Sequence, residues 1–217
     1  MSASPKCLSS VRFGSFLVYS SHGETDVSRR SKSIVSEIKN GRRIAEIVER
    51  LRAETNASRT PHVLAEIFSE ETFVVPCPRS APLSDHSSLW PAWEIGRELV
   101  ARGLAARSGA ILERTTSVRK SSFAAAKDRP KPTAHIASMS VAEQLEFPPR
   151  RIVVVDDVIT RGATLLAAAS LIQHHFPASQ VDAFALVRTL SQGEITGMLA
   201  PVVGEISLSG VDAVRRP

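Results

Sequence analysis

The chain has 217 residues, of which 43% are apolar and 23% are charged, so it can bury one core and wholesale disorder is not expected. No apolar run approaches the ~18 residues that cross a bilayer, and residues 1–10 lack the apolar segment of a secretory signal. We therefore expect a cytoplasmic protein without a membrane anchor. Cys7 and Cys77 lie far apart, which argues against a disulfide framework or a zinc ribbon. The formal net charge of +5 fits a phosphorylated ligand or a nucleic acid equally well.

The N-terminal part carries one strand pattern and two helix patterns. Residues 11–19 are rich in β-branched and aromatic side chains, which predicts a strand. A polar stretch with a small basic cluster follows, which we interpret as solvated surface. Residues 33–39 predict a short helix that Asn40 and Gly41 end, because both tolerate positive φ. A second helix is predicted to run to about Glu54, since apolar residues recur at the spacing of one buried helix face: Ile44, Ile47, Val48 and Leu51.

The middle of the chain predicts a strand, a rigid loop and a helix. Residues 72–75 form a buried-strand pattern that ends in the sequence PCPRS, where two prolines prevent the strand from continuing. A helix is predicted to follow, with Pro91 in its first turn and Gly103 after its end. Trp90 and Trp93 fit its spacing, so we interpret them as packing residues.

Residues 109–113 predict another strand, and a long basic connection follows over residues 114–135. A long loop inside a compact domain is usually functional or disordered. The basic side chains of this connection are Arg114, Arg119, Lys120, Lys127, Arg129 and Lys131.

The strongest pattern spans residues 151–177. Four β-branched residues at 152–155 are typical of a central parallel strand buried on both faces. The segment DDVITRGAT follows, and then a helix that Pro177 ends. Residues 181–187 predict a further strand. Strands that alternate with helices predict an α/β fold with a mostly parallel central sheet flanked by helices.

The segment DDVITRGAT has the composition of a site for ribose 5-phosphate. Gly162 would let the backbone approach a ligand, and the N–H groups at the helix start would face an anion. Thr160 and Thr164 add hydroxyl donors, so these groups could enclose one phosphate. Asp156 and Asp157 accept hydrogen bonds and suit vicinal sugar hydroxyls. The alternative is an ordinary strand–turn–helix in which Asp and Thr cap the helix.

The sequence VVVDDVITRGAT resembles the phosphoribosyl pyrophosphate (PRPP) signature of type I phosphoribosyltransferases. The resemblance implies that Asp156 and Asp157 contact the ribose hydroxyls. It implies that the 5-phosphate is held by the turn Thr160, Arg161, Gly162, Ala163 and Thr164. Arg161 stands where Thr is frequent in the family, and it either contacts the phosphate or faces solvent.

Two further segments resemble parts of the same family. VVPCPRS at residues 74–80 is similar to the loop that meets pyrophosphate, which implies contacts from Cys77, Arg79 and Ser80. Residues 114–135 stand where the family has its mobile catalytic loop. Lys120 and Arg119 are the first candidates to cover the leaving pyrophosphate, and Lys127 and Arg129 are the second.

The order of these segments is similar to ComF-like, competence-associated phosphoribosyltransferases. Those proteins often begin with a cysteine-rich zinc module, which is not expected in this chain, and this departure argues against a role in DNA uptake. The resemblance implies an N-terminal hood over residues 1–60, which would select the acceptor, and a core domain over residues 61–217. A homodimer is compatible with this arrangement.

The implied activity is transfer of phosphoribosyl from PRPP to a nitrogenous acceptor with release of pyrophosphate. Mg²⁺ would be bound mainly through PRPP, without a dedicated protein metal site. Asp157 and Lys120 are the candidate catalytic residues, with Asp157 as a base. One alternative is a non-catalytic PRPP sensor with the same pocket. The less favoured alternative is nucleic-acid binding, because aromatic residues are only 5% and stacking platforms are scarce.

Overall fold

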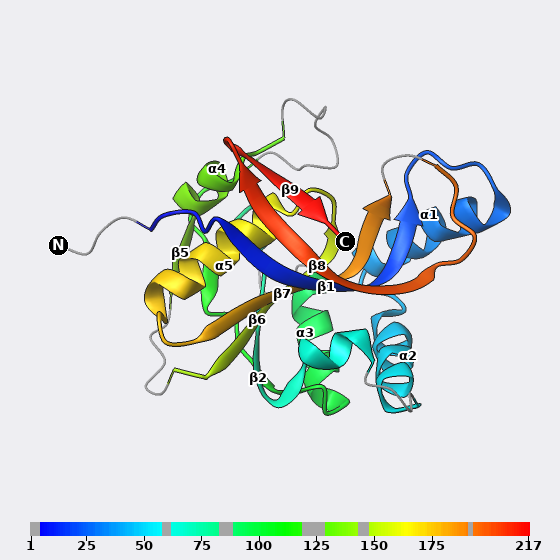
Figure 1. Cartoon of the computed structure of the whole chain (residues 1–217), viewed down its shortest axis with the longest axis horizontal. Coiled ribbons are helices and arrows are strands. Elements are labelled where there is room, and N and C mark those ends of the chain that lie inside the picture. Colours follow the sequence, from blue (N-terminus) through cyan, green and yellow to red (C-terminus); the bar gives the residue numbers. More distant parts are fainter. Residues whose placement is uncertain (1–4, 58–61, 83–88, 119–128, 143–147, 191–192) are drawn as a thin grey trace.

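The computed structural model describes residues 5–57, 62–82, 89–118, 129–142, 148–190 and 193–217 (Figure 1). Its elements in chain order are β1 (Ser10–Ser20), α1 (Asp26–Lys39), α2 (Ile44–Ala57), the 3-10 helix η1 (Val63–Glu66), β2 (Ser69–Pro76), α3 (Pro91–Ala101), β3 (Ala105–Ser108), β4 (Leu112–Arg114), α4 (Pro132–Ala137), β5 (Met139–Val141), β6 (Arg151–Ile159), α5 (Ala163–His175), β7 (Gln180–Leu190), β8 (Leu199–Ser209) and β9 (Asp212–Arg216).

One large sheet organises these elements, in the strand order β3-β2-β6-β7-β1-β8-β9. The five strands β3, β2, β6, β7 and β1 run parallel to one another. β8 pairs antiparallel with β1, and β9 pairs antiparallel with β8. Figure 1 shows β8 and β9, in red, beside β1 at this edge. The predicted mostly parallel central sheet is therefore confirmed.

The central strands are buried on both faces because their side chains alternate between two cores. Ile152 and Val154 of β6 face one core, and Val153 and Val155 face the other. The first core is covered by α5 with the small β4–β5 sheet, and the second by α1, α2, η1 and α3. Figure 1 shows α4 next to α5 and α3 near α2. Helices on both faces explain the continuous apolar run of β6.

The N-terminal segment, predicted as a hood, contributes a strand to the central sheet. β1 lies inside the sheet and pairs with β7 and β8, so it is part of the core. The helices α1 and α2 pack their apolar faces on one side of the same sheet. Residues 10–57 thus share the sheet and one of its cores with later parts of the described chain, and the division at residue 60 stays a prediction.

Helix α1 begins well before the predicted residue 33, because its N-terminus is capped from far along the chain. Thr25 is the N-cap residue, and its hydroxyl accepts a hydrogen bond from Ser28 N. The Glu194 carboxylate accepts from the Thr25 hydroxyl at 2.7 Å and from the Ser28 hydroxyl at 2.6 Å. These bonds, together with those from the main chain of Glu24 and Thr25, lower the pKa of Glu194 to about 2. An acidic group at a helix N-terminus is also favoured by the helix dipole.

Several short strands depart from the sequence prediction. The strand predicted at 109–113 is divided between β4 and a preceding loop, and β3 ends before Gly109. β5 was not predicted, and it pairs with β4 in a small separate sheet. β8 and β9 were not predicted either. None of the described helices is long and apolar enough to span a membrane.

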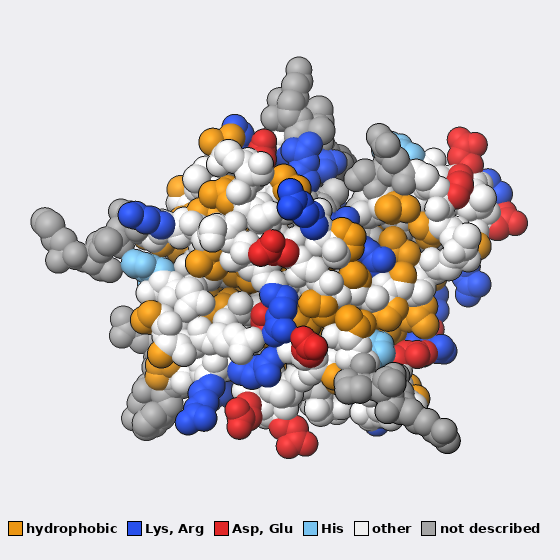
Figure 2. All heavy atoms as spheres, in the orientation of Figure 1, with side chains coloured by type: hydrophobic (Ala, Val, Ile, Leu, Met, Phe, Trp, Pro, Cys, Tyr) orange, Lys and Arg blue, Asp and Glu red, His pale blue; other side chains and the backbone are white. Residues whose placement is uncertain are grey.

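The surface shown in Figure 2 mixes charges of both signs. On this face the described Lys and Arg side chains are interspersed with Asp and Glu rather than gathered in one stripe, and apolar side chains collect over the β8 side. Leu199 of β8 is 42% exposed and Val214 of β9 is 37% exposed.

Candidate functional site

The acidic pair lies inside strand β6 rather than after it. Asp156 pairs with Ala185 of β7, and the strand continues to Ile159. The Asp156 carboxylate accepts a 2.9 Å hydrogen bond from Asp157 N, and the Asp157 carboxylate accepts a 2.8 Å bond from Val158 N. Both side chains are half-buried near the carboxyl end of the sheet. This is the edge where open α/β sheets bind ligands.

The two carboxyl groups are held close together, and neither forms an ion pair with a described residue. Burial and the neighbouring Asp157 raise the pKa of Asp156 well above its ordinary value. The ion pairs formed among the described residues all lie elsewhere in the molecule. The pair thus retains acceptor capacity for hydroxyl groups or for a ligand-borne cation.

The turn after β6 presents main-chain donors. Gly162 is the N-cap residue of α5, has a φ of 91° and supplies no side-chain cap. The first bond into the helix runs from Leu166 N to Gly162 O at 2.8 Å. The N–H groups of residues 161–165 donate no hydrogen bond to any described residue. Free N–H groups at a helix start attract an anion.

The structure gives glycine at position 162 a packing reason in addition to the predicted approach of a ligand. A Cβ placed there would lie 2.7 Å from Cγ2 of Ile206, on β8. The missing side chain thus makes room for Ile206 of the sheet. The left-handed φ is a second reason, because side chains other than glycine are strained there.

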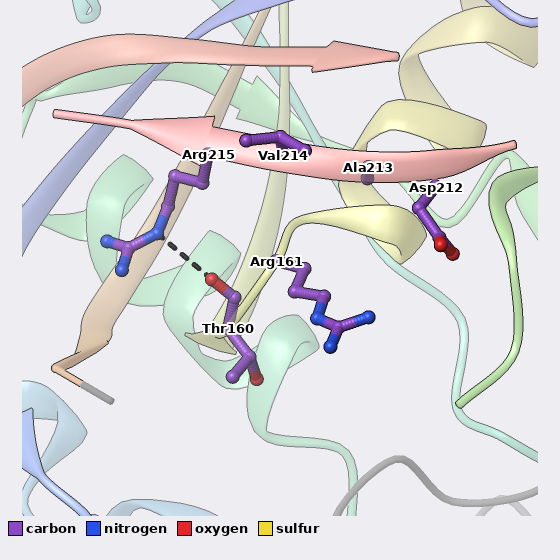
Figure 3. A pocket seen from close by; sticks show the side chains of 6 residues that line it. All are labelled: Thr160, Arg161, Asp212, Ala213, Val214 and Arg215. Atoms are coloured by element: carbon purple, nitrogen blue, oxygen red, sulfur yellow. Dashed lines mark hydrogen bonds between the residues drawn. The ribbon is translucent and has the colours of Figure 1, made fainter. Parts of the chain in front are cut away.

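Thr160 and Arg161 line a cavity of about 330 Å³ together with β9 (Figure 3). Arg215 of β9 donates through Nε to the Thr160 carbonyl at 3.0 Å and through Nη2 to the Thr189 carbonyl at 2.7 Å. Burial and the nearby Arg188 lower the pKa of Arg215. Figure 3 shows the Arg161 side chain on the Asp212 side of the turn, and Arg161 is exposed. The Arg215 side chain therefore holds the turn through the main-chain carbonyl of Thr160.

Cys77 does not have the ligand-contacting role that was predicted. Its side chain is only 2% exposed and packs in the apolar core, and burial raises the pKa of its thiol. Its N–H donates to Val155 O at 2.8 Å, and its carbonyl accepts from Trp90 Nε1 at 2.8 Å. The main chain of Cys77 thus fixes the loop beside β6. Trp90 also stacks on Trp93, in agreement with a packing role.

Arg79 and Ser80 continue this loop after Cys77. The Arg79 carbonyl accepts from Nε of Arg114 at 2.9 Å, and the Ser80 carbonyl accepts from Val118 N at 2.8 Å. Both residues are half-buried. With these carbonyls engaged, the loop is held next to the β6 end. Arg119, Lys120 and Lys127 lie outside the described residues.

Two residues of this region were not singled out from the sequence. Arg114 is 6% exposed and His135 is 3% exposed. His135 Nε2 lies 3.5 Å from the hydroxyl of Thr164, in the first turn of α5. Burial and the charge of Arg114 lower the pKa of His135 to about 4. Arg114 was noted only as one of the basic residues of the 114–135 connection, and His135 belongs to no motif or apolar periodicity, so the sequence carried no signal for their contacts.

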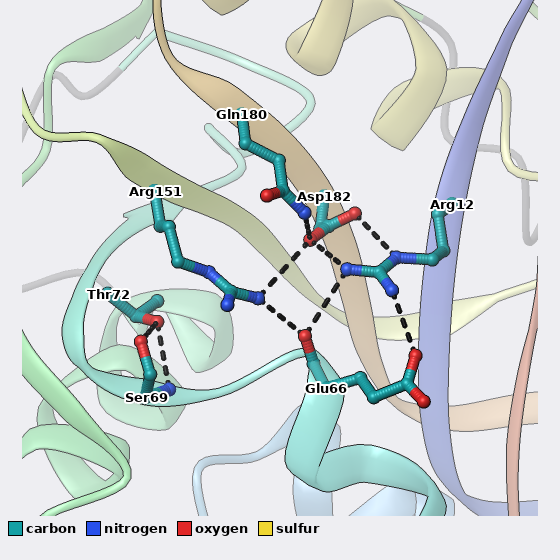
Figure 4. Close-up of polar contacts among 7 residues, drawn as sticks. All are labelled: Arg12, Glu66, Ser69, Thr72, Arg151, Gln180 and Asp182. Carbon is teal, nitrogen blue, oxygen red and sulfur yellow. Dashed lines mark hydrogen bonds and ion pairs between the residues drawn. The ribbon is translucent and has the colours of Figure 1, made fainter.

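A different polar cluster lies at the opposite end of the parallel strands, where β6 and β7 begin (Figure 4). Asp182 of β7 is 4% exposed and accepts from Arg12 Nε at 2.9 Å and from Arg12 Nη2 at 2.8 Å. Gln180 donates to the same carboxylate at 3.0 Å, and Arg151 lies 3.9 Å away. This carboxylate is fully paired, in contrast to the acids of β6.

Together, the fold and the site define an α/β protein with acidic residues at the end of a central strand and a turn of free main-chain donors after it. No protein-family model and no curated protein sequence matches the chain. Two similar solved structures are adenine phosphoribosyltransferases. The one from Leishmania tarentolae is 12% identical, with 81% of this chain and 83% of that chain covered and a TM-score of 0.32. The one from Leishmania donovani is 12% identical, with 85% and 83% covered and a TM-score of 0.33.

Proposed function

We propose that this chain binds PRPP and transfers its phosphoribosyl group to a nitrogenous acceptor, with release of pyrophosphate. One observation carries the proposal: the two acids of β6 form no ion pair with a described residue, and N–H groups without a described partner follow within a few residues. Acceptor-only carboxylates suit sugar hydroxyls, and donor-only amides suit a phosphate. A ribose 5-phosphate carries hydroxyls and a phosphate on one small molecule.

The proposed binding mode follows from the neighbouring elements. The 5-phosphate would lie at the start of α5, over residues 161–165, and the ribose hydroxyls would contact Asp156 and Asp157. The pyrophosphate would extend toward Arg79 and Ser80, because β2 and β6 are adjacent parallel strands and their ends meet at one edge of the sheet. Cys77 is excluded from this contact set by its burial.

The proposed reaction breaks the bond between C1 of the ribose and a pyrophosphate oxygen, which leaves with the electron pair. A nitrogen of the acceptor forms the new bond to C1 and loses a proton. Positioning and electrostatic stabilisation would supply most of the rate acceleration. Asp157 is the proposed base, and Lys120 and Arg119 are proposed to neutralise the departing pyrophosphate. We further propose a ComF-like subtype and a cytoplasmic location.

Mg²⁺ fits this site as an ion carried by the ligand. The described residues contain no group of three or more His, Cys, Asp or Glu side chains that could hold a metal ion. An ion held mainly by PRPP oxygens would match the preference of Mg²⁺ for few protein ligands and retained waters. When bound, Mg²⁺ would neutralise charge on the pyrophosphate. Chelation of Mg²⁺ is expected to lower the affinity for PRPP.

The test is pyrophosphate release measured with PRPP, Mg²⁺ and a panel of nucleobases. We expect release that depends on one acceptor, and we expect Asp157→Asn to slow it by about 10²-fold, as for loss of a general base. PRPP binding without release for any acceptor would favour the non-catalytic sensor instead. Absence of PRPP binding would reject both.

A further inference from the structure

The two loops proposed to hold PRPP are joined by a buried polar connection through β4 and α4. Arg114, at the end of β4, donates through Nε to the Arg79 carbonyl at 2.9 Å and through Nη1 to the Ser138 hydroxyl at 2.6 Å. The Ser138 hydroxyl donates in turn to the Ala134 carbonyl at 2.8 Å. One guanidinium thus ties the loop after β2 to the short helix α4.

His135 continues the connection to the turn after β6. Its Nε2 lies 3.5 Å from the hydroxyl oxygen of Thr164, at the long limit for a hydrogen bond. Its Nδ1 is buried and has no hydrogen-bond partner among the described residues. A buried imidazole with one unpartnered nitrogen is unusual in a core, because burying an unsatisfied polar group costs free energy.

The chemistry of a neutral imidazole decides which nitrogen carries the proton. With the proton on Nδ1, a buried N–H group would be left without an acceptor, which is rarer in proteins than an under-satisfied acceptor. With the proton on Nε2, His135 donates to the Thr164 oxygen. The hydroxyl proton of Thr164 is then left to point toward a ligand, and a phosphate ester accepts such bonds. The low pKa of His135 keeps the ring neutral at pH 7.

We propose that Arg114 and His135 are positioning residues of the PRPP site: Arg114 holds the main chain at Arg79 for the pyrophosphate, and His135 aims the Thr164 hydroxyl at the 5-phosphate. This inference rests on the proposed function. It predicts that each residue governs one half of the ligand, because each contacts a different loop.

The test uses the full chain and the two halves of PRPP separately, ribose 5-phosphate and magnesium pyrophosphate, with dissociation constants from calorimetry. His135→Phe is expected to weaken ribose 5-phosphate about tenfold, as for loss of one bond to a charged group, and to leave pyrophosphate unchanged. His135→Gln is expected to restore binding, because the glutamine amide nitrogen lies near the position of Nε2. Arg114→Lys is expected to weaken the binding of magnesium pyrophosphate and to leave that of ribose 5-phosphate unchanged. A lysine cannot donate to the Arg79 carbonyl and the Ser138 hydroxyl with the geometry of a guanidinium.

Controls and a second route keep the test decisive. His174→Phe and Arg107→Lys change the same residue types away from the site, and neither is expected to alter either constant. In a Thr164→Val background, His135→Phe is expected to have no further effect on ribose 5-phosphate. Equal weakening of both half-ligands by His135→Phe, failure of His135→Gln to restore binding, or additive effects with Thr164→Val would overturn the inference alone. Wild-type protein that binds neither half-ligand would overturn the proposed function as well.

Discussion

Gly162 and Ile206 are in such close contact that a Cβ on the glycine would lie 2.7 Å from the isoleucine Cγ2. The contact joins the turn after β6 to the antiparallel strand β8. Gly162 also has a φ of 91°, so alanine is disfavoured there for two independent reasons. The position of this turn therefore depends on a strand that lies much later in the sequence, beyond α5 and β7.

We predict that Gly162→Ala lowers the free energy of unfolding by about 1–3 kcal/mol, through backbone strain and overpacking against Ile206. Urea unfolding measures the change. Gly193 has a φ of 94°, but a Cβ there would meet no described atom within 4 Å, so Gly193→Ala separates the two causes. An equal loss in both variants would show that contact with Ile206 contributes nothing.

Asp156→Asn is predicted to stabilise the ligand-free protein. The folded-state pKa of Asp156 is raised above its ordinary value of 3.8, so its favourable contribution exists below that value and is lost as the pH rises through the folded pKa. At pH 7, well above that ordinary value, the raised pKa of Asp156 means that this side chain opposes folding. Removing it is expected to raise Tm by about 2–4 °C, equivalent to about 1 kcal/mol.

Asp182→Asn is the matched control for that change. Asp182 is paired with Arg12, so its loss is expected to lower Tm. The opposite signs distinguish a carboxylate kept for a ligand from one kept for structure. A lower Tm for Asp156→Asn at pH 7 would contradict the claim that the Asp156 side chain opposes folding in the ligand-free protein.

His135 is predicted to make the protein sensitive to acid. Its pKa is lowered from 6.5 to about 4, so the stability of the neutral form is lost as the pH falls below 6.5 and through 4. His135→Gln removes this titration. Between pH 7 and 4, Tm is expected to fall further for the wild type than for His135→Gln, and an equal fall in the two proteins would refute the assignment.

Glu194→Gln is predicted to destabilise α1. The pKa of Glu194 is lowered to about 2, so its contribution is present above its ordinary value of 4.5 and disappears as the pH falls through 2. Amide exchange in α1 provides the local measurement, with protection lower in the variant at pH 7. Unchanged protection near Ser28 would contradict the role of Glu194 as a cap.

The sequence predicted the elements whose signals are local. The β-branched run of β6 and the periodicity of α2 each identify an element from a few neighbouring residues, and both were confirmed. The first turns of α1 were missed because Glu194, the carboxylate that supports the N-cap Thr25 and Ser28, is distant in the sequence. β8 and β9 were missed for a related reason: they form an antiparallel edge whose side chains are only partly buried, so no clear alternation marks them.

The candidate site was predictable only where residue type alone limits the chemistry. An acidic pair followed by T-x-G-x-T restricts the ligand, and the structure places these residues together at the end of β6 and the start of α5. Cys77 was assigned to the ligand from its place in a loop, but its burial depends on packing against residues from other strands. Arg114 and His135 acquire their roles only from tertiary contacts.

Calorimetric titration of PRPP, with Mg²⁺ present, into the wild-type chain and into the double variant Asp156→Asn, Asp157→Asn tests the central claim most directly. The wild type is expected to bind with one site per chain, and the double variant is expected to show no detectable heat of binding while remaining folded. Equal affinity in the two proteins would contradict the claim that these carboxylates hold the ribose.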